Sequence, residues 1–175
     1  MNESNGNAVV RLVARTGLGD FEVTATARGL RSVTPLRPGR TVAERAPEGA
    51  ALAHARAAAE ALRRYAEGAR EGYSGPFDLD APAFPVAVWE ELRAIPFGAT
   101  RSYGEIAARL GVPGEARAVG AAVAPNPVCV LIPCHRVVGA DGSLKGFAWG
   151  LDLKRRLLAH EAAALPLFSS DPAPA

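Results

Sequence analysis

The sequence contains few cysteines and no long apolar run. Two of its 175 residues are cysteines, Cys129 and Cys134, which is too few for a disulfide framework. No C-x-x-C pair is present, and we expect no bound metal. No apolar stretch approaches the about 20 residues of a membrane span, and Met1–Asn7 lacks the apolar core of a signal peptide. We therefore expect a cytoplasmic protein with no membrane partner.

Lysine is also scarce: Lys145 and Lys154 are the only two, whereas arginine is abundant. The formal net charge of +2 neither requires nor excludes a nucleic-acid partner. Hydrophobic residues make up 49% and charged residues 22%, as in ordinary globular proteins. The length suits one good core or two small lobes that share a chain.

The first part of the chain predicts a small α/β lobe over residues 8–75. Three short segments rich in β-branched residues are separated by glycine-containing turns, at Val9–Ala14, Phe21–Thr26 and Leu30–Val33. Thr34–Gly49 should be a loop, because it is rich in proline, arginine and glycine. Ala50–Arg70 is dominated by alanine and predicts a helix that ends near Gly68. Prolines at 76, 82 and 85 then predict an extended linker over residues 76–83.

The second part, residues 84–165, predicts a mostly helical domain. Helices are expected at Val86–Ile95, Tyr103–Leu110, Glu115–Ala124 and Leu151–Leu165. Thr100 or Ser102 can cap the second of these, with Glu105 in its first turn. The two short helices around Gly111–Gly114 have the outline of a helix-turn-helix. The apolar run Val128–Ile132 predicts a buried strand, and residues 166–175 a flexible tail, so the chain is of the α+β class.

Chemistry is expected at Cys134, in the segment Ile132-Pro-Cys-His-Arg-Val-Val138. A buried packing thiol is the ordinary role of a free cysteine. Here, however, Pro133 restricts the preceding backbone, and His135 and Arg136 follow at once, so that either could stabilise a thiolate. Adjacent side chains on an extended backbone point apart. Transfer of the Cys134 proton to His135 therefore needs a sharp turn or a bridging water.

A base needs a partner that orients it, and the closing helix offers Glu161. Glu161 shares a helical face with Leu157, Leu158 and Leu165, and this face points toward the core. A lone buried carboxylate is costly, so an imidazole is a natural partner. A solvated position at the edge of the apolar face is the alternative, and spacing alone does not separate the two.

Three segments resemble one known family, namely PCHRVVGADGSLKGFAWGLDLKRRLLAHE, IPFGATRSYGEIAARLG and ARAVGAAVAPNPVCVLIPCHRV. They are similar to the methylated-DNA–protein-cysteine methyltransferases, also called O6-alkylguanine-DNA alkyltransferases, over roughly residues 84–161. The resemblance implies direct-reversal DNA repair by a suicide enzyme. Such an enzyme moves a methyl or other alkyl group from O6-alkylguanine irreversibly onto Cys134, without a cofactor. O4-alkylthymine is a second candidate substrate.

The resemblance also implies roles for individual residues. Cys134 is the acceptor, His135 activates it through a water, Glu161 orients His135, and Asn126 holds the active-site turn. The expected partner is double-stranded DNA, bound by a monomer through the helix-turn-helix in the minor groove. Arg117 would enter the base stack, and Tyr103 would press on the phosphate as the damaged base flips out. Further residues expected to contact substrate or DNA are Ala118, Gly120, Arg136, Val137, Phe147, Ala148 and Trp149.

The chain departs from the family pattern in two places. Relatives usually read G-Y-x-G-G in the pocket loop, where this chain has Gly146-Phe-Ala-Trp-Gly150, so substrate range is open. The N-terminal lobe resembles its family counterpart, a ribonuclease H-like unit, in layout only, and it lacks the family's zinc-binding cysteines. Two rival functions remain. One is a damage sensor that binds lesions without transfer, against which Cys134 argues. The other is a cysteine hydrolase, which would need an oxyanion hole.

Overall fold

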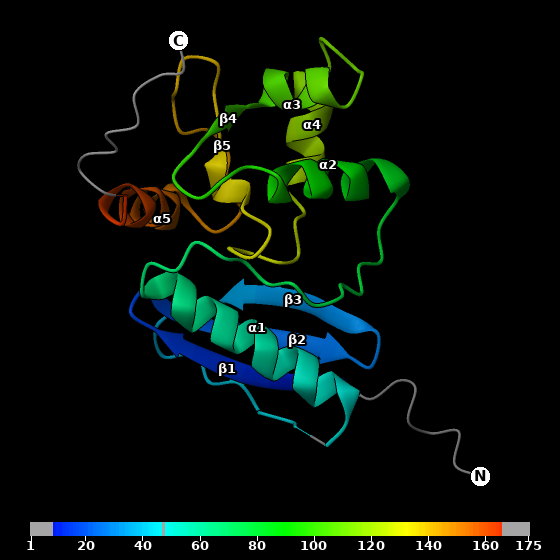
Figure 1. The fold of residues 1–175 in the computed structure, drawn as a ribbon, viewed down its shortest axis with the longest axis vertical. Helices are drawn as coiled ribbons and strands as arrows, with labels where there is room; N and C mark the ends of the chain where they lie inside the picture. The colour runs from blue at the N-terminus through cyan, green and yellow to red at the C-terminus, as the bar shows by residue number, and fades with distance from the viewer. Residues whose placement is uncertain (1–8, 47, 166–175) are drawn as a thin grey trace, which may run out of the picture.

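The computed structural model describes residues 9–46 and 48–165, and in that part of the chain it combines a three-stranded sheet, a two-stranded parallel sheet of β4 and β5, and five α-helices (Figure 1). The elements are β1 (Val10–Thr16), β2 (Gly19–Thr26), β3 (Gly29–Pro35), α1 (Ala50–Ala66), α2 (Ala83–Arg93), β4 (Arg101–Ser102), α3 (Tyr103–Arg109), α4 (Ala116–Val123), β5 (Val137–Val138) and α5 (Leu151–Ala163). The predicted mixture of α and β structure is confirmed. The tail predicted at residues 166–175 lies outside the described residues.

The sheet is antiparallel in the order β1-β2-β3, and α1 lies across it (Figure 1). Alternate side chains of the strands point toward α1 and are almost fully buried, among them Val10, Ala14 and Val23. The facing side of α1 is largely alanine, including Ala55 and Ala58, which are also buried. Small side chains on this side bring the helix axis close to the sheet, and the alanines favour the helix itself.

The predicted linker is hydrogen-bonded to the strand β3. The Leu30 amide donates to the Pro76 carbonyl at 2.9 Å, and the Asp78 amide donates to the Leu30 carbonyl at 2.9 Å. Gly29 has a φ of +149°, and a Cβ there would collide with the Pro76 carbonyl. The close approach of this segment to β3 therefore requires glycine at position 29.

The helices after the linker follow the predicted start signals. Ser102 caps α3: its hydroxyl accepts from the Glu105 amide at 3.2 Å, while the Glu105 carboxylate accepts from the Ser102 amide at 2.6 Å. The turn into α4 contains Gly111 and Gly114, both at positive φ. Of the helices in residues 9–46 and 48–165, none combines the length and apolarity needed to cross a membrane.

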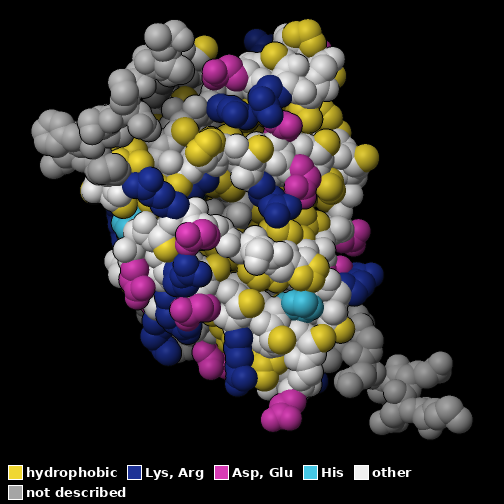
Figure 2. Space-filling model, viewed as in Figure 1, with side chains coloured by type: hydrophobic (Ala, Val, Ile, Leu, Met, Phe, Trp, Pro, Cys, Tyr) yellow, Lys and Arg dark blue, Asp and Glu magenta, His cyan; other side chains and the backbone are white. Residues whose placement is uncertain are grey.

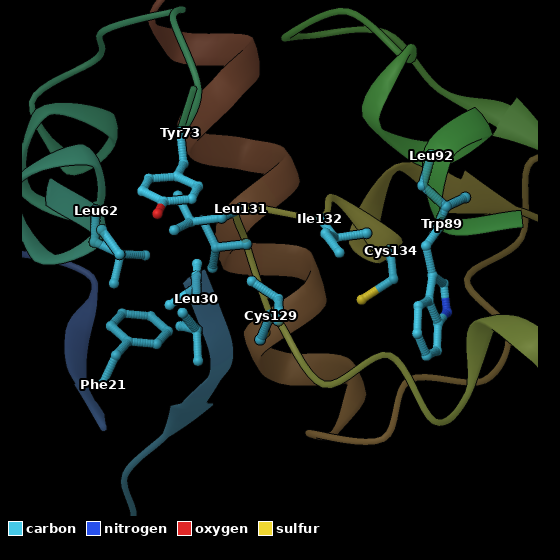
Figure 3. Packing of buried hydrophobic residues seen from close by; sticks show 14 of the residues in the cluster. Phe21, Leu30, Leu62, Tyr73, Trp89, Leu92, Cys129, Leu131, Ile132 and Cys134 are labelled. Carbon is cyan, nitrogen blue, oxygen red and sulfur yellow. The ribbon is translucent and has the colours of Figure 1, made fainter. Parts of the chain in front are cut away.

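The strand predicted at Val128–Ile132 is wrong, although its burial was expected correctly. These residues form turns, with only an isolated bridge between Val128 and Val33 of β3. Val130 has a φ of +71°, and the Ile132 amide donates back to the Val128 carbonyl at 2.9 Å. Figure 3 shows Leu131 and Ile132 between the sheet residues Phe21 and Leu30 on one side and Trp89 of α2 on the other. The loop before Cys134 is thus the centre of the core.

Candidate active site

The loop that presents Cys134 is held by the side chain of Asn126. Its Nδ2 donates to the Ile132 carbonyl at 2.8 Å, and its Oδ1 accepts from the Val128 amide at 3.0 Å. Asn126 is 4% exposed, so both bonds form away from bulk water. One amide side chain therefore closes the turn whose backbone would otherwise have unpaired polar groups.

Cys134 begins a single 3₁₀ turn, Cys134–Arg136, and is 5% exposed. Several groups act on its thiol. A hydrogen bond from the Cys129 thiol lowers the pKa of Cys134, burial raises it, and the Asn126 side chain and the Lys154 charge lower it further. The net effect is a lowered pKa of Cys134, which makes its nucleophilic thiolate form easier to reach than in an ordinary cysteine. Burial keeps the pKa of Cys129 itself well above its ordinary value, so Cys129 stays a thiol and can donate.

His135 is fully buried and lies against Glu161 of α5. Its Nε2 is 2.7 Å from Oε1 of Glu161, whereas Nδ1 has no hydrogen-bond partner among the described residues. Burial lowers the pKa of His135, and the bond to Glu161 opposes that change only in part. Because an ionised Glu161 can only accept, the ring proton belongs on Nε2. Nδ1 then carries a free lone pair, as a general base requires.

Glu161 is 1% exposed and accepts from four groups. Besides His135, Oε1 accepts from the Tyr65 hydroxyl at 2.8 Å, Oε2 accepts from the Gly98 amide at 2.8 Å, and the Arg136 guanidinium donates to both oxygens at 3.0–3.1 Å. Burial alone would raise the pKa of Glu161, but the bonds from His135 and Arg136 prevail and lower it to about 2. The carboxylate is a fixed anion at every physiological pH.

Arg136, which was predicted to contact substrate or DNA, points into the protein. It is 8% exposed, and its guanidinium also donates to the Ile95 carbonyl at 2.6 Å. Val137 is fully buried, and its carbonyl accepts from the Lys154 ammonium at 2.5 Å. Arg136 and Val137 are therefore buried, and they hold Glu161 and Lys154 in place through hydrogen bonds.

Lys154 is a buried cation with carbonyl partners only. Its Nζ donates to the carbonyls of Val137 and Lys145, which ties β5 and the loop after it to α5. Burial lowers the pKa of Lys154, and the negative charge of a Cys134 thiolate raises it. No carboxylate contacts Nζ among the described residues, so the Lys154 ammonium lies near Cys134 without a neutralising acid and favours loss of the Cys134 proton.

The remaining predicted pocket residues lie on the loop before α5. The hydroxyl of Tyr103 donates to the Lys145 carbonyl at 3.1 Å, and burial together with Cys134 raises the pKa of Tyr103. Phe147 and Trp149 are half-buried and Ala148 is exposed. Ala148 and Trp149 line a cavity of about 960 Å³ with Phe21 of β2 and other residues of the sheet. The structure therefore brings Tyr103 to the start of this loop but places Trp149 beside the sheet.

The predicted DNA-contacting residues of α4 are accessible. Arg117 is exposed, and Ala118 and Gly120 are half-buried. A Cβ at Gly120 would be 3.7 Å from the Tyr103 ring, so α3 and α4 are in close contact at this point. Figure 2 shows basic and acidic side chains interspersed over the face in view, which therefore carries no patch of one sign.

Sequence reasoning missed Tyr65, Gly98 and Lys154 as parts of the site. A tyrosine within an alanine-rich helix indicates apolar packing and carries no signal for a polar role, and the Gly98 contact is made by a main-chain amide that has no sequence signature. Lys154 had a usable signal, because its spacing places it one turn before Leu157 and Leu158 on the buried side of α5.

Both the sequence and the structure of this chain are similar to those of known proteins. A family model for "6-O-methylguanine DNA methyltransferase, DNA binding domain" matches residues 83–163. The methylated-DNA–protein-cysteine methyltransferase of Mycolicibacterium paratuberculosis is 48% identical over 115 residues, which is 63% of this chain and 70% of that protein.

Solved structures match over nearly the whole chain. The O6-methylguanine methyltransferase of Mycobacterium tuberculosis has a TM-score of 0.74 at 34% identity, covering 92% of this chain and 97% of that one. Mycobacterium tuberculosis OGT in complex with DNA has a TM-score of 0.73 at 36% identity, covering 89% and 94%. With the PCHRV segment at the centre of the buried network described above, this chain belongs to the methylated-DNA–protein-cysteine methyltransferase family.

Proposed function

We propose that this protein repairs DNA by moving an alkyl group from O6 of guanine to Sγ of Cys134. The observation that carries the proposal is the arrangement of Cys134, His135 and Glu161. The thiol has a lowered pKa, and the neighbouring imidazole presents an unpaired Nδ1 while its Nε2 is held by the carboxylate. Such a chain suits a nucleophile that must be deprotonated at neutral pH.

The transfer is a direct displacement at the alkyl carbon. The Cys134 proton passes to Nδ1 of His135 through a bridging water, and Glu161 stabilises the imidazolium that forms. The sulfur–carbon bond forms as the carbon–O6 bond breaks, and the guanine takes up a proton as charge develops on O6. The Tyr103 hydroxyl, held protonated by its raised pKa, is the proposed donor; it then regains a proton from solvent, and the His135 imidazolium releases one. The thioether product is stable, so each molecule acts once.

The DNA side of the proposal uses α3 and α4 as a helix-turn-helix. The exposed Arg117 would replace the extruded base in the stack, and the small residues Ala118 and Gly120 would let α4 approach the minor groove closely. Tyr103, which packs against α4 at Gly120, would help rotate the target nucleotide.

Access to the thiol needs a movement of the loop at residues 145–149. Cys134 is 5% exposed, and a purine cannot reach it through so small an opening. Tyr103 donates to the Lys145 carbonyl, so an incoming base would separate these two groups and enter between them. Phe147, Ala148 and Trp149 would then contact the base or its alkyl group, and Trp149 would set the range of adducts, with O4-alkylthymine as a further candidate.

The proposal also includes the domain organisation, the location and the oligomeric state of the protein. The sheet with α1 would be a ribonuclease H-like N-terminal domain (8–75), joined by residues 76–83 to the catalytic and DNA-binding domain (84–165). The protein would act as a cytoplasmic monomer on double-stranded DNA. The hydrogen bonds between Val33 of β3 and the loop at Pro127 and Cys129 support a fixed contact between these domains.

The test is incubation with duplex DNA that carries O6-methylguanine, followed by mass spectrometry of the peptides. We expect one methyl group per protein on Cys134, none on Cys129, and no turnover with excess DNA. Cys134→Ser, which keeps the size of the side chain, should accept nothing. Tight lesion binding by the natural sequence without methylation would identify a damage sensor instead, and loss of the alkyl group as a free alcohol with turnover would identify a hydrolase.

A further inference from the structure

Tyr65 brings a hydroxyl group from the N-terminal part of the chain into the site. It lies in the last turn of α1 and is 6% exposed. Its hydroxyl donates to Oε1 of Glu161 at 2.8 Å and is 3.3 Å from Nε2 of His135. These three polar groups form a buried triangle that joins residues separated by up to 96 positions in the sequence.

The chemistry of the triangle fixes the direction of every bond. Burial, with the charge of Glu161, raises the pKa of Tyr65 far above its ordinary value, so the hydroxyl keeps its proton. Glu161 is an anion and accepts. Tyr65 therefore donates to Oε1, and His135 must present Nε2–H to the same oxygen. The Tyr65 oxygen can accept a second, longer contact from that N–H. Only the His135 tautomer that is protonated on Nε2 and unprotonated on Nδ1 fits this arrangement.

We propose that Tyr65 is a positioning residue of the alkyl transfer, holding Glu161 so that His135 keeps Nδ1 free as the base. The inference rests on the proposed function and extends it, because it makes α1 a part of the catalytic relay. The hydroxyl also shares the charge of Glu161 with His135. Tyr65 thereby limits how strongly the carboxylate can hold a proton on the imidazole.

Packing alone would not need the hydroxyl. The Tyr65 ring meets Phe97 edge-on at 5.8 Å between centroids and lies 5.3 Å from the His160 ring. Tyr65→Phe keeps these contacts and removes one oxygen. Tyr73→Phe is a matched control, because Tyr73 is also 6% exposed and its hydroxyl donates to a carbonyl, that of Pro76, at 3.2 Å. Among the described residues, Tyr73 makes no hydrogen bond to His135 or Glu161.

The sign of the expected pH effect follows from the charges around the imidazole. The titratable and charged groups that face Tyr65 and His135 are Glu161, His160 and Lys154 of α5, Arg136 and Cys134 of the 3₁₀ turn, and Cys129 of the preceding loop. Tyr65→Phe leaves all of them in place and removes one donor from Glu161. The carboxylate then acts more strongly on His135 and raises its pKa, so the base is protonated at a higher pH.

The experiment is the single-turnover rate of methyl transfer from O6-methylguanine duplex between pH 5.5 and 9, with DNA affinity measured in parallel. For Tyr65→Phe we expect the acid side of the profile to move to higher pH. The rate at pH 6 should fall about tenfold, a fraction of the about 10²–10⁴ that general base catalysis contributes. The dissociation constant should change less than twofold. Tyr73→Phe should keep the profile of the natural sequence.

A second variant tests whether Tyr65 acts through Glu161. In a Glu161→Gln background, Tyr65→Phe should change the rate by less than twofold, because the group that it positions is already gone. Coincident profiles for Tyr65→Phe and the natural sequence would overturn the inference, as would an equal tenfold loss in both backgrounds. Absence of transfer by the natural sequence would instead reject the proposed function.

Discussion

His135 and Glu161 meet through one nitrogen of the imidazole and one oxygen of the carboxylate, 2.7 Å apart, in a place closed to solvent. The second nitrogen, Nδ1, has no partner among the described residues. Glu161 thus fixes the proton of His135 on the side away from the free lone pair. Arg136 also donates to Glu161 and, together with His135, keeps the carboxylate ionised.

The lowered pKa of Glu161 predicts a loss of stability in acid. The folded value of about 2 lies below the ordinary 4.5, so folding gains stability above about pH 4.5 and loses it as the pH falls toward 2. The shift corresponds to about 3 kcal/mol. The free energy of unfolding in urea should fall by about 2 kcal/mol between pH 6 and pH 3, because the rest of the effect is lost only below pH 3.

Two variants separate Glu161 from the other acids. Glu161→Gln should be destabilised at pH 6 by about 3–5 kcal/mol, because Arg136 loses its buried partner, and it should depend less on pH below 5. Glu60→Gln, which alters an exposed pair with Arg63, should retain the slope of the natural sequence. An unchanged slope in Glu161→Gln would contradict the assignment.

The buried ammonium of Lys154 predicts a second change, in the reactivity of Cys134. Lys154→Met keeps much of the side-chain length and removes the charge that favours the thiolate. The pKa of Cys134 should rise, and its rate of reaction with iodoacetamide at pH 7 should fall about 3- to 10-fold. Peptide mass spectrometry over a pH series resolves Cys134 from Cys129.

Lys145→Met is the matched control, since Lys145 is the only other lysine and its side chain is exposed. Its main-chain carbonyl, which accepts from Lys154 and Tyr103, stays in place. The control should react like the natural sequence. Equal slowing by both substitutions would mean that net charge, and not the buried ammonium, governs the thiol.

Arg117 provides a prediction about DNA. Arg117→Ala should slow repair of O6-methylguanine in duplex DNA at least about tenfold, because the gap left by the extruded base is no longer filled. Reaction with free O6-benzylguanine, which needs no extrusion, should change less than twofold. Second-order rate constants for the two substrates give the comparison.

Arg155→Ala controls for the loss of one positive charge near DNA. Arg155 is exposed on α5 and pairs with Asp152 at 2.7 Å, away from the predicted helix-turn-helix. We expect both of its rates to stay within about twofold of the natural sequence, since an exposed pair contributes little. If Arg117→Ala lowers both rates equally, the side chain has no role in extrusion.

Local signals in the sequence predicted most of the secondary structure. The alanine-rich run gave α1, and the Ser102–Glu105 spacing gave the capped start of α3, because both depend on neighbours a few residues away. The run Val128–Ile132 misled for a physical reason: consecutive apolar residues report burial, not backbone conformation. The hydrogen bonds of Asn126 and the positive φ of Val130 decide the conformation there.

The site was predictable to the extent that its chemistry is local or follows a helix face. Cys134 and His135 are adjacent, and Glu161 was identified from the inward face of α5. Tyr65 was not identified as polar, because its ring reads as apolar and its partner is 96 residues away. Arg136 was expected to contact substrate or DNA, whereas its guanidinium is buried against the carboxylate of Glu161.

Main-chain hydrogen bonds join β3 of the sheet to the loop that precedes Cys134. The Val33 amide donates to the Pro127 carbonyl at 2.9 Å, and the Cys129 amide donates to the Val33 carbonyl at 3.0 Å. Peptide groups are the same for every residue type except proline, so this junction places little demand on which side chains β3 carries. Substitutions of β3 side chains that leave the strand's main chain in place should therefore leave the position of the catalytic loop unchanged.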